Sequence, residues 1–185
     1  MKKFFLLLIC ITFPFSLFAQ ERKLLPLSEG KYFSVYGDNL NAILVLEKIN
    51  SPSLVSVDSI FTKTDNLYDV LAETLDNLYS EVSDILDIHM YSFHSKIHIV
   101  RDKFQLNSIL NRRYKMDFTK EALYLHEENT IYVSLEDLTL GMLGHEIGHA
   151  IVSRYFVVPP PVKVQEVLCG YVEYNLRKKT KEIPH

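Results

Sequence analysis

Apolar residues recur at three- and four-residue intervals between residues 65 and 87 and predict one long amphipathic helix there. Its stripe consists of Leu67, Leu71, Leu75, Leu78, Val82 and Ile85. Segments rich in aromatic and β-branched residues predict four strands, the last two joined by a polar turn. These strands cover residues 31–36, 96–100, 122–125 and 130–134. Residues 39–48 contain a near-continuous apolar run, for which periodicity leaves a short helix and a buried strand both open.

Three further helices are predicted, over residues 102–110, 135–155 and 162–178. Ser134 and Asp137 have the spacing of a capping box, which marks the start of the second of these helices. Gly141, Gly144 and Gly148 lie inside it, although each glycine costs a helix about 1 kcal/mol relative to alanine. We therefore expect another backbone or a substrate to approach this helix closely. A triproline turn separates it from the last helix, and helices and strands together predict an α+β fold.

The N-terminal residues 1–19 have the features of a secretory signal. Lys2 and Lys3 precede a dense apolar stretch, and a small residue, Ala19, precedes a polar one. The apolar stretch is short for a bilayer span, and Pro14 interrupts it. We expect cleavage after Ala19 and export to a periplasm or to the exterior. The mature protein is then expected to have no stable membrane span.

Composition and charge narrow the choice of partners. The chain of 185 residues is 48% hydrophobic and 23% charged, which suits one domain over residues 20–185 and hardly two. Removal of the signal takes away two lysines and no acid, so 18 basic and 23 acidic residues remain and the net charge is −5. This balance gives no electrostatic reason to expect nucleic acid or an anionic membrane as a partner. Cys10 leaves with the signal, so Cys169 has no intramolecular disulfide partner.

Residues 145–149 read His-Glu-Ile-Gly-His and fall within a predicted helix. On a helix, His145 and His149 lie on one face, where two imidazoles can bind a single Zn²⁺ ion. Glu146 is then placed to act as the general base for a zinc-bound water, which is the chemistry of metallopeptidases. We therefore predict Zn²⁺ as the cofactor and a peptide or protein as the substrate.

A catalytic zinc site takes three protein ligands and leaves a fourth position open, so one more ligand is needed. We favour Glu166, because it lies in the first turn of the helix that folds back after the triproline turn. Glu173 is nearly on the same face of that helix. It is either the alternative third zinc ligand or a side chain that contacts one of the zinc ligands. We interpret Cys169 as a small buried helix residue. The candidates after the second histidine are Glu166, Cys169, Glu173, Glu182 and His185.

Other metal-site patterns do not fit the sequence. No aspartate follows residue 137, which excludes a downstream aspartate ligand. Val152 and Tyr155 occupy the positions where a metzincin has glycine and histidine. His89, His94 and His98 have spacings of five and four, which do not share one face of a strand, so we interpret them as ordinary histidines.

The segment from Thr130 to Leu176 resembles the core of gluzincin-type metallopeptidases of the peptidase MA clan. In that family a strand precedes the His-Glu-x-x-His helix, and a second helix carries glutamate in a context such as Asn-Glu-Gly-Leu-Ala-x-Tyr. The corresponding run here is Gln-Glu-Val-Leu-Cys-Gly-Tyr at residues 165–171. The glutamate and the small residues one turn later match, whereas the family's common tryptophan before the glutamate and glycine after it do not. The part of the chain before this segment resembles the family only in outline.

This resemblance implies a zincin-like fold with a small mixed or antiparallel sheet, an active-site helix, and a following helix that carries the third zinc ligand. It also implies that residues 130–134 form the edge strand that binds substrate backbone.

We predict from these residues an exported, zinc-dependent peptidase in which Glu146 is the general base. The tetrahedral oxyanion needs a further donor, for which Tyr155, Tyr171 and Tyr174 are candidates. The alternative is a non-catalytic binding or structural protein on a zincin scaffold, with a structural metal or none. Retention of Glu146 argues against this alternative, because a purely structural site needs no general base.

Overall fold

The computed structural model describes residues 25–51, 66–115 and 119–180. The predicted signal, residues 1–19, lies outside these ranges. At the centre is a five-stranded mixed sheet with the strand order β1-β2-β3-β5-β4. Strands β2, β3 and β5 run parallel, and β1 and β4 pair antiparallel to them at the two edges. The strands are β1 Ser28–Glu29, β2 Phe33–Tyr36, β3 Ser95–Val100, β4 Ala122–Leu125 and β5 Thr130–Ser134.

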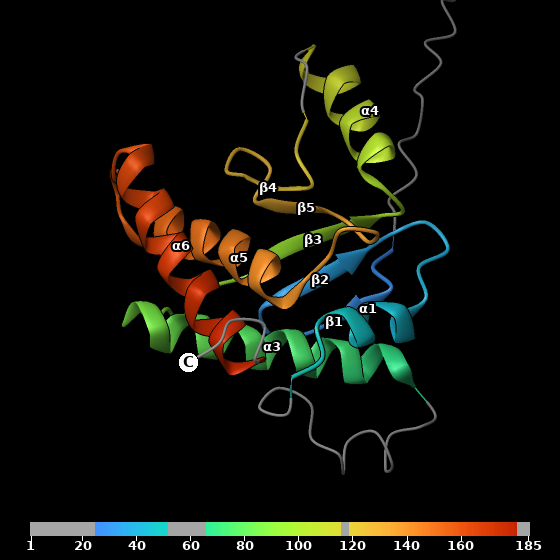
Figure 1. Cartoon of the computed structure of the whole chain (residues 1–185), viewed down its shortest axis with the longest axis horizontal. Coiled ribbons are helices and arrows are strands. Elements are labelled where there is room, and N and C mark those ends of the chain that lie inside the picture. Colours follow the sequence, from blue (N-terminus) through green and yellow to red (C-terminus); the bar gives the residue numbers. More distant parts are fainter. Residues whose placement is uncertain (1–24, 52–65, 116–118, 181–185) are drawn as a thin grey trace, which may run out of the picture.

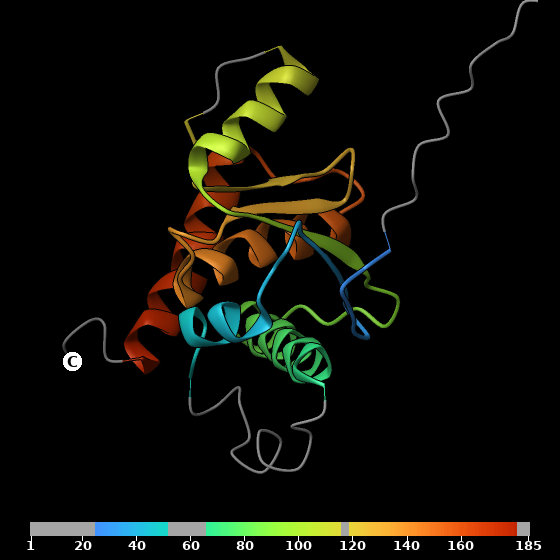
Figure 2. The ribbon, with the colours of Figure 1, turned by 90° about the vertical axis from the view of Figure 1, so that its right-hand side faces the viewer.

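Helices cover both faces of the sheet (Figures 1 and 2). Helices α3 and α5 pack against one face, and α4 packs against the other. Side chains alternate along the strands, so Ile97 and Ile131 enter the main core, whereas Tyr132 packs under α4 with Leu106. Helix α6 lies outside α5 (Figure 1). The helices are α1 Ala42–Lys48, α3 Leu67–Leu86, α4 Lys103–Tyr114, α5 Leu140–Tyr155 and α6 Val162–Lys179.

The predicted elements are largely confirmed. The long helix, the four strands and the last helix all form close to their predicted bounds, and α4 extends four residues beyond its predicted end. The ambiguous run is helix α1, because the Asn41 side chain accepts a hydrogen bond from the Ile43 N–H and Val45 is buried in the core. The two-residue strand β1 lies in a segment for which no strand was predicted.

The start of α5 was predicted wrongly. The residues after Ser134 form a turn, and the helix begins only after Thr139, whose side chain accepts a hydrogen bond from the Met142 N–H at 3.2 Å. Ser134 is instead the last residue of β5, and its hydroxyl donates to Asp137 Oδ2 at 2.8 Å. The hydrogen bond between Ser134 and Asp137 therefore stabilises the bend after strand β5, although the spacing of the two residues is that of a capping box at the start of a helix.

The expectation that residues 130–134 form the edge strand is also wrong. Strand β5 lies inside the sheet, pairing parallel with β3 through Ile97 and Ile131 and antiparallel with β4 through Ala122 and Val133. All of its residues are buried, as is typical of an interior strand. The edge strand on this side is β4, which contacts α5.

A polar network joins α4 to the β4–β5 hairpin. Glu128, in the hairpin turn, accepts hydrogen bonds from the Arg113 guanidinium at 2.5 Å, from the Tyr132 hydroxyl at 2.7 Å and from the Tyr114 hydroxyl. Burial raises the pKa of Glu128, but these three donors outweigh it and hold the pKa below its ordinary value of 4.5. The network therefore fixes α4 against the hairpin whose outer strand is β4.

Candidate metal centre

Glycines on α5 allow α6 to approach closely. A Cβ atom on Gly144 would overlap Leu176 Cδ1 of α6, which is fully buried. A Cβ atom on Gly148 would lie 3.2 Å from Cys169 Sγ, and one on Gly141 would also meet an α6 side chain. The expectation of a close approach is confirmed, and the approaching element is α6.

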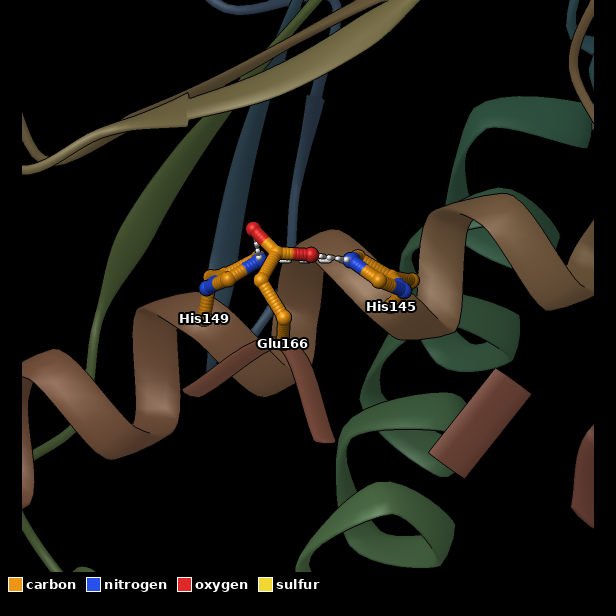
Figure 3. Close-up of side chains that lie close together, drawn as sticks. All are labelled: His145, His149 and Glu166. Carbon is orange, nitrogen blue, oxygen red and sulfur yellow. Dashed lines mark hydrogen bonds and ion pairs between the residues drawn. The ribbon is translucent and has the colours of Figure 1, made fainter. Parts of the chain in front are cut away.

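This packing brings His145, His149 and Glu166 together (Figure 3). The Nε2 atoms of His145 and His149 are 3.2 Å apart. Glu166 Oε2 lies 3.5 Å from His145 Nε2, and Glu166 Oε1 lies 3.5 Å from His149 Nε2. One ligand atom from each residue lies within 4.8 Å of the others. The three side chains therefore form a group that could hold a metal ion.

The spacing and the donor types fit Zn²⁺. Two ligands of a tetrahedral zinc ion with bonds of about 2.0–2.1 Å are about 3.3–3.4 Å apart. The separation of the two imidazole nitrogens and both nitrogen–oxygen separations lie close to this value. Both imidazoles are largely buried, whereas the Glu166 side chain is 54% exposed, so one side of the group faces the solvent. Within the described ranges, no other group of three such residues has this spacing.

Glu146 lies between the two histidines in sequence and is almost completely buried, with 9% of its surface exposed. Burial raises the pKa of Glu146 to about 7, although a hydrogen bond from the Tyr124 backbone and the charge of Lys120 both lower it. Tyr124 belongs to the edge strand β4, so the Glu146 carboxylate lies next to that strand. Burial, followed by the charge of His145, lowers the pKa of His149 and favours the neutral imidazole that binds metals.

Two α6 side chains approach the other nitrogens of the histidines. Gln165 Oε1 lies 3.4 Å from His149 Nδ1, and the Gln165 amide donates to the Pro160 carbonyl at 2.8 Å. Glu173 Oε2 lies 3.3 Å from His145 Nδ1. The two atoms lack the alignment of a hydrogen bond, so this buried nitrogen has no hydrogen-bond partner among the described residues. Groups at these positions orient the rings of metal-binding histidines.

A cleft of about 420 Å³ opens over the histidines, Glu146 and Glu166. Three consecutive β4 residues, 122–124, line it. Because side chains alternate between the faces of a strand, the cleft follows the free edge of β4 rather than one face of the sheet. Pro159 and Val162 also line this cleft, and a smaller cleft of about 250 Å³ is lined by Met142, Glu146 and Glu173 among others.

The tyrosines predicted as oxyanion donors lie elsewhere. Tyr155, Tyr171 and Tyr174 are each about half exposed, and none lines either cleft. Among the polar residues that do line the larger cleft are Lys120 and His126, at the two ends of β4.

Among the described residues, Cys169 and His94 are not part of the metal group. Cys169 is fully buried, and burial raises the pKa of its thiol to about 12, so the thiol remains protonated. His94 contacts the Ser34 hydroxyl at 2.8 Å, as an ordinary structural histidine does. Glu182 and His185 lie outside the described residues.

Gln165, Lys120 and His126 line the larger cleft but were not among the predicted site residues. Gln165 directly precedes Glu166, so its position beside the helix reversal was a signal that it faces the second histidine. Lys120 and His126 had no comparable signal, because their place at the cleft depends on which strand lies at the edge of the sheet.

No protein-family model, curated protein or solved structure matches this chain. What is shown of this chain is an α+β fold in which His145, His149 and Glu166 could hold a metal ion.

Proposed function

We propose that the protein is an exported, zinc-dependent peptidase of gluzincin type. The observation that carries the proposal is the convergence of His145, His149 and Glu166 from two helices, with the buried Glu146 carboxylate in the same cleft. A structural metal site would need no such carboxylate.

The residues have distinct roles in this reaction. Zinc held by His145, His149 and Glu166 would polarise the scissile carbonyl and acidify a water molecule. Glu146 accepts a proton from the attacking water as the carbon–oxygen bond forms. It then passes this proton to the leaving amine as the carbon–nitrogen bond breaks.

The free edge of β4 is suited to hold an extended peptide. An unpaired strand edge presents backbone N–H and C=O groups, to which a peptide can add as a further strand. The hydrogen bond between the Tyr124 backbone and Glu146 supports this arrangement, because it puts the general base directly beside the strand edge. Lys120 and His126 line the larger cleft, where a cationic or hydrogen-bonding side chain can stabilise the oxyanion.

A non-catalytic metal-binding or structural protein is the second candidate. The observation in its favour is that none of the three predicted tyrosine donors lines the cleft. Zinc binding without hydrolysis would support this candidate.

The decisive experiment combines zinc analysis with hydrolysis of a mixed peptide library. We expect the protein to bind one zinc ion and to cleave peptides. Glu146→Gln should keep the zinc and lose about 10²–10⁴-fold in rate, whereas His149→Ala should lose both. The exposed Glu47 is a matched control, and Glu47→Gln should change neither property. Equal cleavage by the parent and by Glu146→Gln would refute the mechanism.

Export is tested separately. The mature protein recovered from the producing cell should begin at residue 20, as measured by mass spectrometry of the intact chain. Recovery of uncleaved protein from the cytoplasm would refute export.

A further inference from the structure

Helix α6 is apolar on two opposite faces. Its inner face buries Cys169, Val172 and Leu176. Its outer face carries a second apolar series, which we call the outer stripe and whose residues are between 47% and 72% exposed. The outer stripe consists of Val164, Val167, Tyr171 and Tyr174. A helix that is apolar on both faces is usually buried on both.

The spacing of the outer stripe is that of a helix–helix seam. Its residues follow one another at intervals of three, four and three, which is the alternation of the a and d positions in a coiled coil. Such a series keeps one line of side chains facing a partner helix from Val164 to Tyr174 of α6. Among the described elements, α6 packs mainly on α5 and α3 (Figure 1), and the residues of the outer stripe are left exposed.

The outer stripe has the size of a functional apolar patch, which suits a small, reversible interface. Two valines that precede α6, Val157 and Val158, are also 100% and 81% exposed. The four residues of the outer stripe alone expose on the order of 450 Å², within the roughly 300–600 Å² of the largest and often functional patch on a typical monomer. Each partner in a standard protein–protein interface contributes about 800 Å².

Gly170 supplies an independent observation. At each of the three glycines of α5, a Cβ atom would contact an α6 side chain, and this close contact explains the glycine. A Cβ atom on Gly170, in contrast, would meet nothing within 4 Å. Glycine in the interior of a helix is unfavourable, and nothing in the described chain requires it at this position. Gly170 follows Val167 by three residues and precedes Tyr174 by four, so it flanks the outer stripe on the helix surface. A glycine here is explained if a second backbone approaches from outside.

We propose that the outer stripe is an interface between two copies of this chain, related by a two-fold axis that passes close to Gly170. The two α6 helices run antiparallel. The last turn of α6 carries Arg177, Lys178 and Lys179, and a parallel pair would bring both basic ends together. An antiparallel pair separates them and also aligns the helix dipoles favourably. A two-fold axis makes the stripe complementary to itself, as the most common oligomers require.

Sedimentation velocity of the purified protein at micromolar concentrations tests this proposal. We expect a reversible dimer. Tyr171→Glu places a charge in the seam and should raise the dimer dissociation constant by about thirtyfold or more. Tyr91→Glu is the matched control, because Tyr91 is fully exposed outside the stripe, and it should leave the dissociation constant unchanged.

Gly170→Ala tests whether the two α6 backbones approach each other closely at Gly170 or whether only the apolar side chains of the outer stripe touch. Within one chain the added methyl group meets nothing, so the variant should fold at least as well as the parent, as measured by thermal unfolding. It should nevertheless raise the dissociation constant by about tenfold, because the methyl group pushes the two backbones apart. A protein that is monomeric throughout, or a dimer that is insensitive to Tyr171→Glu and Gly170→Ala, would overturn the proposal. A monomer that binds vesicles of phosphatidylcholine and phosphatidylglycerol through the outer stripe would also overturn it and would make the stripe a membrane-binding surface.

Discussion

Replacement of Gly144 by alanine tests whether the contact between α5 and α6 sets the geometry of the metal group. The new methyl group would overlap Leu176 Cδ1 and lie 3.6 Å from Val172 Cγ1. Leu176 is fully buried, so it cannot turn into solvent to make room. Overpacking of this kind costs about 1–3 kcal/mol, and the higher helix propensity of alanine offsets about 1 kcal/mol of that cost. We expect the free energy of unfolding to fall by about 1–2 kcal/mol.

The same change should weaken metal binding. Relief of the overlap requires α6 to move away from α5, and Glu166 would move with it relative to both histidines. We expect zinc affinity to fall by roughly tenfold, as it does when groups that support metal ligands are disturbed. Urea unfolding measures the stability, and competition with a chelator of known affinity measures the zinc binding.

Two further variants determine whether the overlap is the cause. Gly141→Ala makes the same substitution on the same helix, but its methyl group would lie 2.7 Å from Cγ of the exposed, flexible Arg177. This side chain can move aside, so Gly141→Ala should leave stability unchanged or increase it. Leu176→Ala alone should cost about 2–5 kcal/mol, and in the Gly144→Ala background it should cost about 1–3 kcal/mol less, because it removes the overlap. Additive effects within about 0.5 kcal/mol would refute the reasoning.

Three other predictions concern the metal group and the hairpin. The lowered pKa of Glu128 means that its hydrogen bonds stabilise the fold above about pH 4.5 and that this stabilisation is lost as the pH falls through the folded-state pKa. Urea unfolding from about pH 6 to about pH 3 should therefore show the deficit of Glu128→Gln shrinking as the pH falls, and a constant deficit would contradict this account. Gln165→Leu removes the contact with His149 and should lower zinc affinity by about 10–100-fold in chelator competition, whereas unchanged affinity would show that Gln165 does not orient the ring. Zinc at about 100 times its dissociation constant should raise the free energy of unfolding by about 2.7 kcal/mol; Glu166→Ala should abolish this increase, and identical unfolding with and without chelator in the parent would exclude the site.

The sequence predicted the metal group well because its determinants are local. His145 and His149 are four residues apart on one helix, and the triproline turn requires the next helix to reverse, which brings Glu166 back to them. The glycines of α5 predicted that a backbone or a substrate approaches this helix closely, but they did not indicate that the neighbour is α6. Periodicity likewise predicted α3, because its apolar stripe is long and regular.

The errors come from contacts between distant parts of the chain. Whether residues 130–134 form an edge or an interior strand depends on pairing with β3, which precedes β5 by about thirty residues and leaves no mark on the local pattern. Ser134 and Asp137 satisfy a capping-box spacing and do form a hydrogen bond, but the pairing of β5 keeps Ser134 in the sheet. Tyr171 and Tyr174 follow Glu166 on α6, but the packing of α6 on α5 turns them outwards into the outer stripe, away from both clefts.

The position of the cleft along the edge of β4 has a consequence for solubility. An unpaired strand edge is where sheet proteins associate with one another and begin to aggregate. Here residues 122–124 of that edge line the cleft, and α5 contacts β4 beside it, so the groups that can receive a peptide lie within the cleft. An occupant of the cleft would cover the edge further. The empty protein is therefore expected to aggregate faster than the occupied one, which would make a bound peptide or inhibitor a stabiliser of the soluble form.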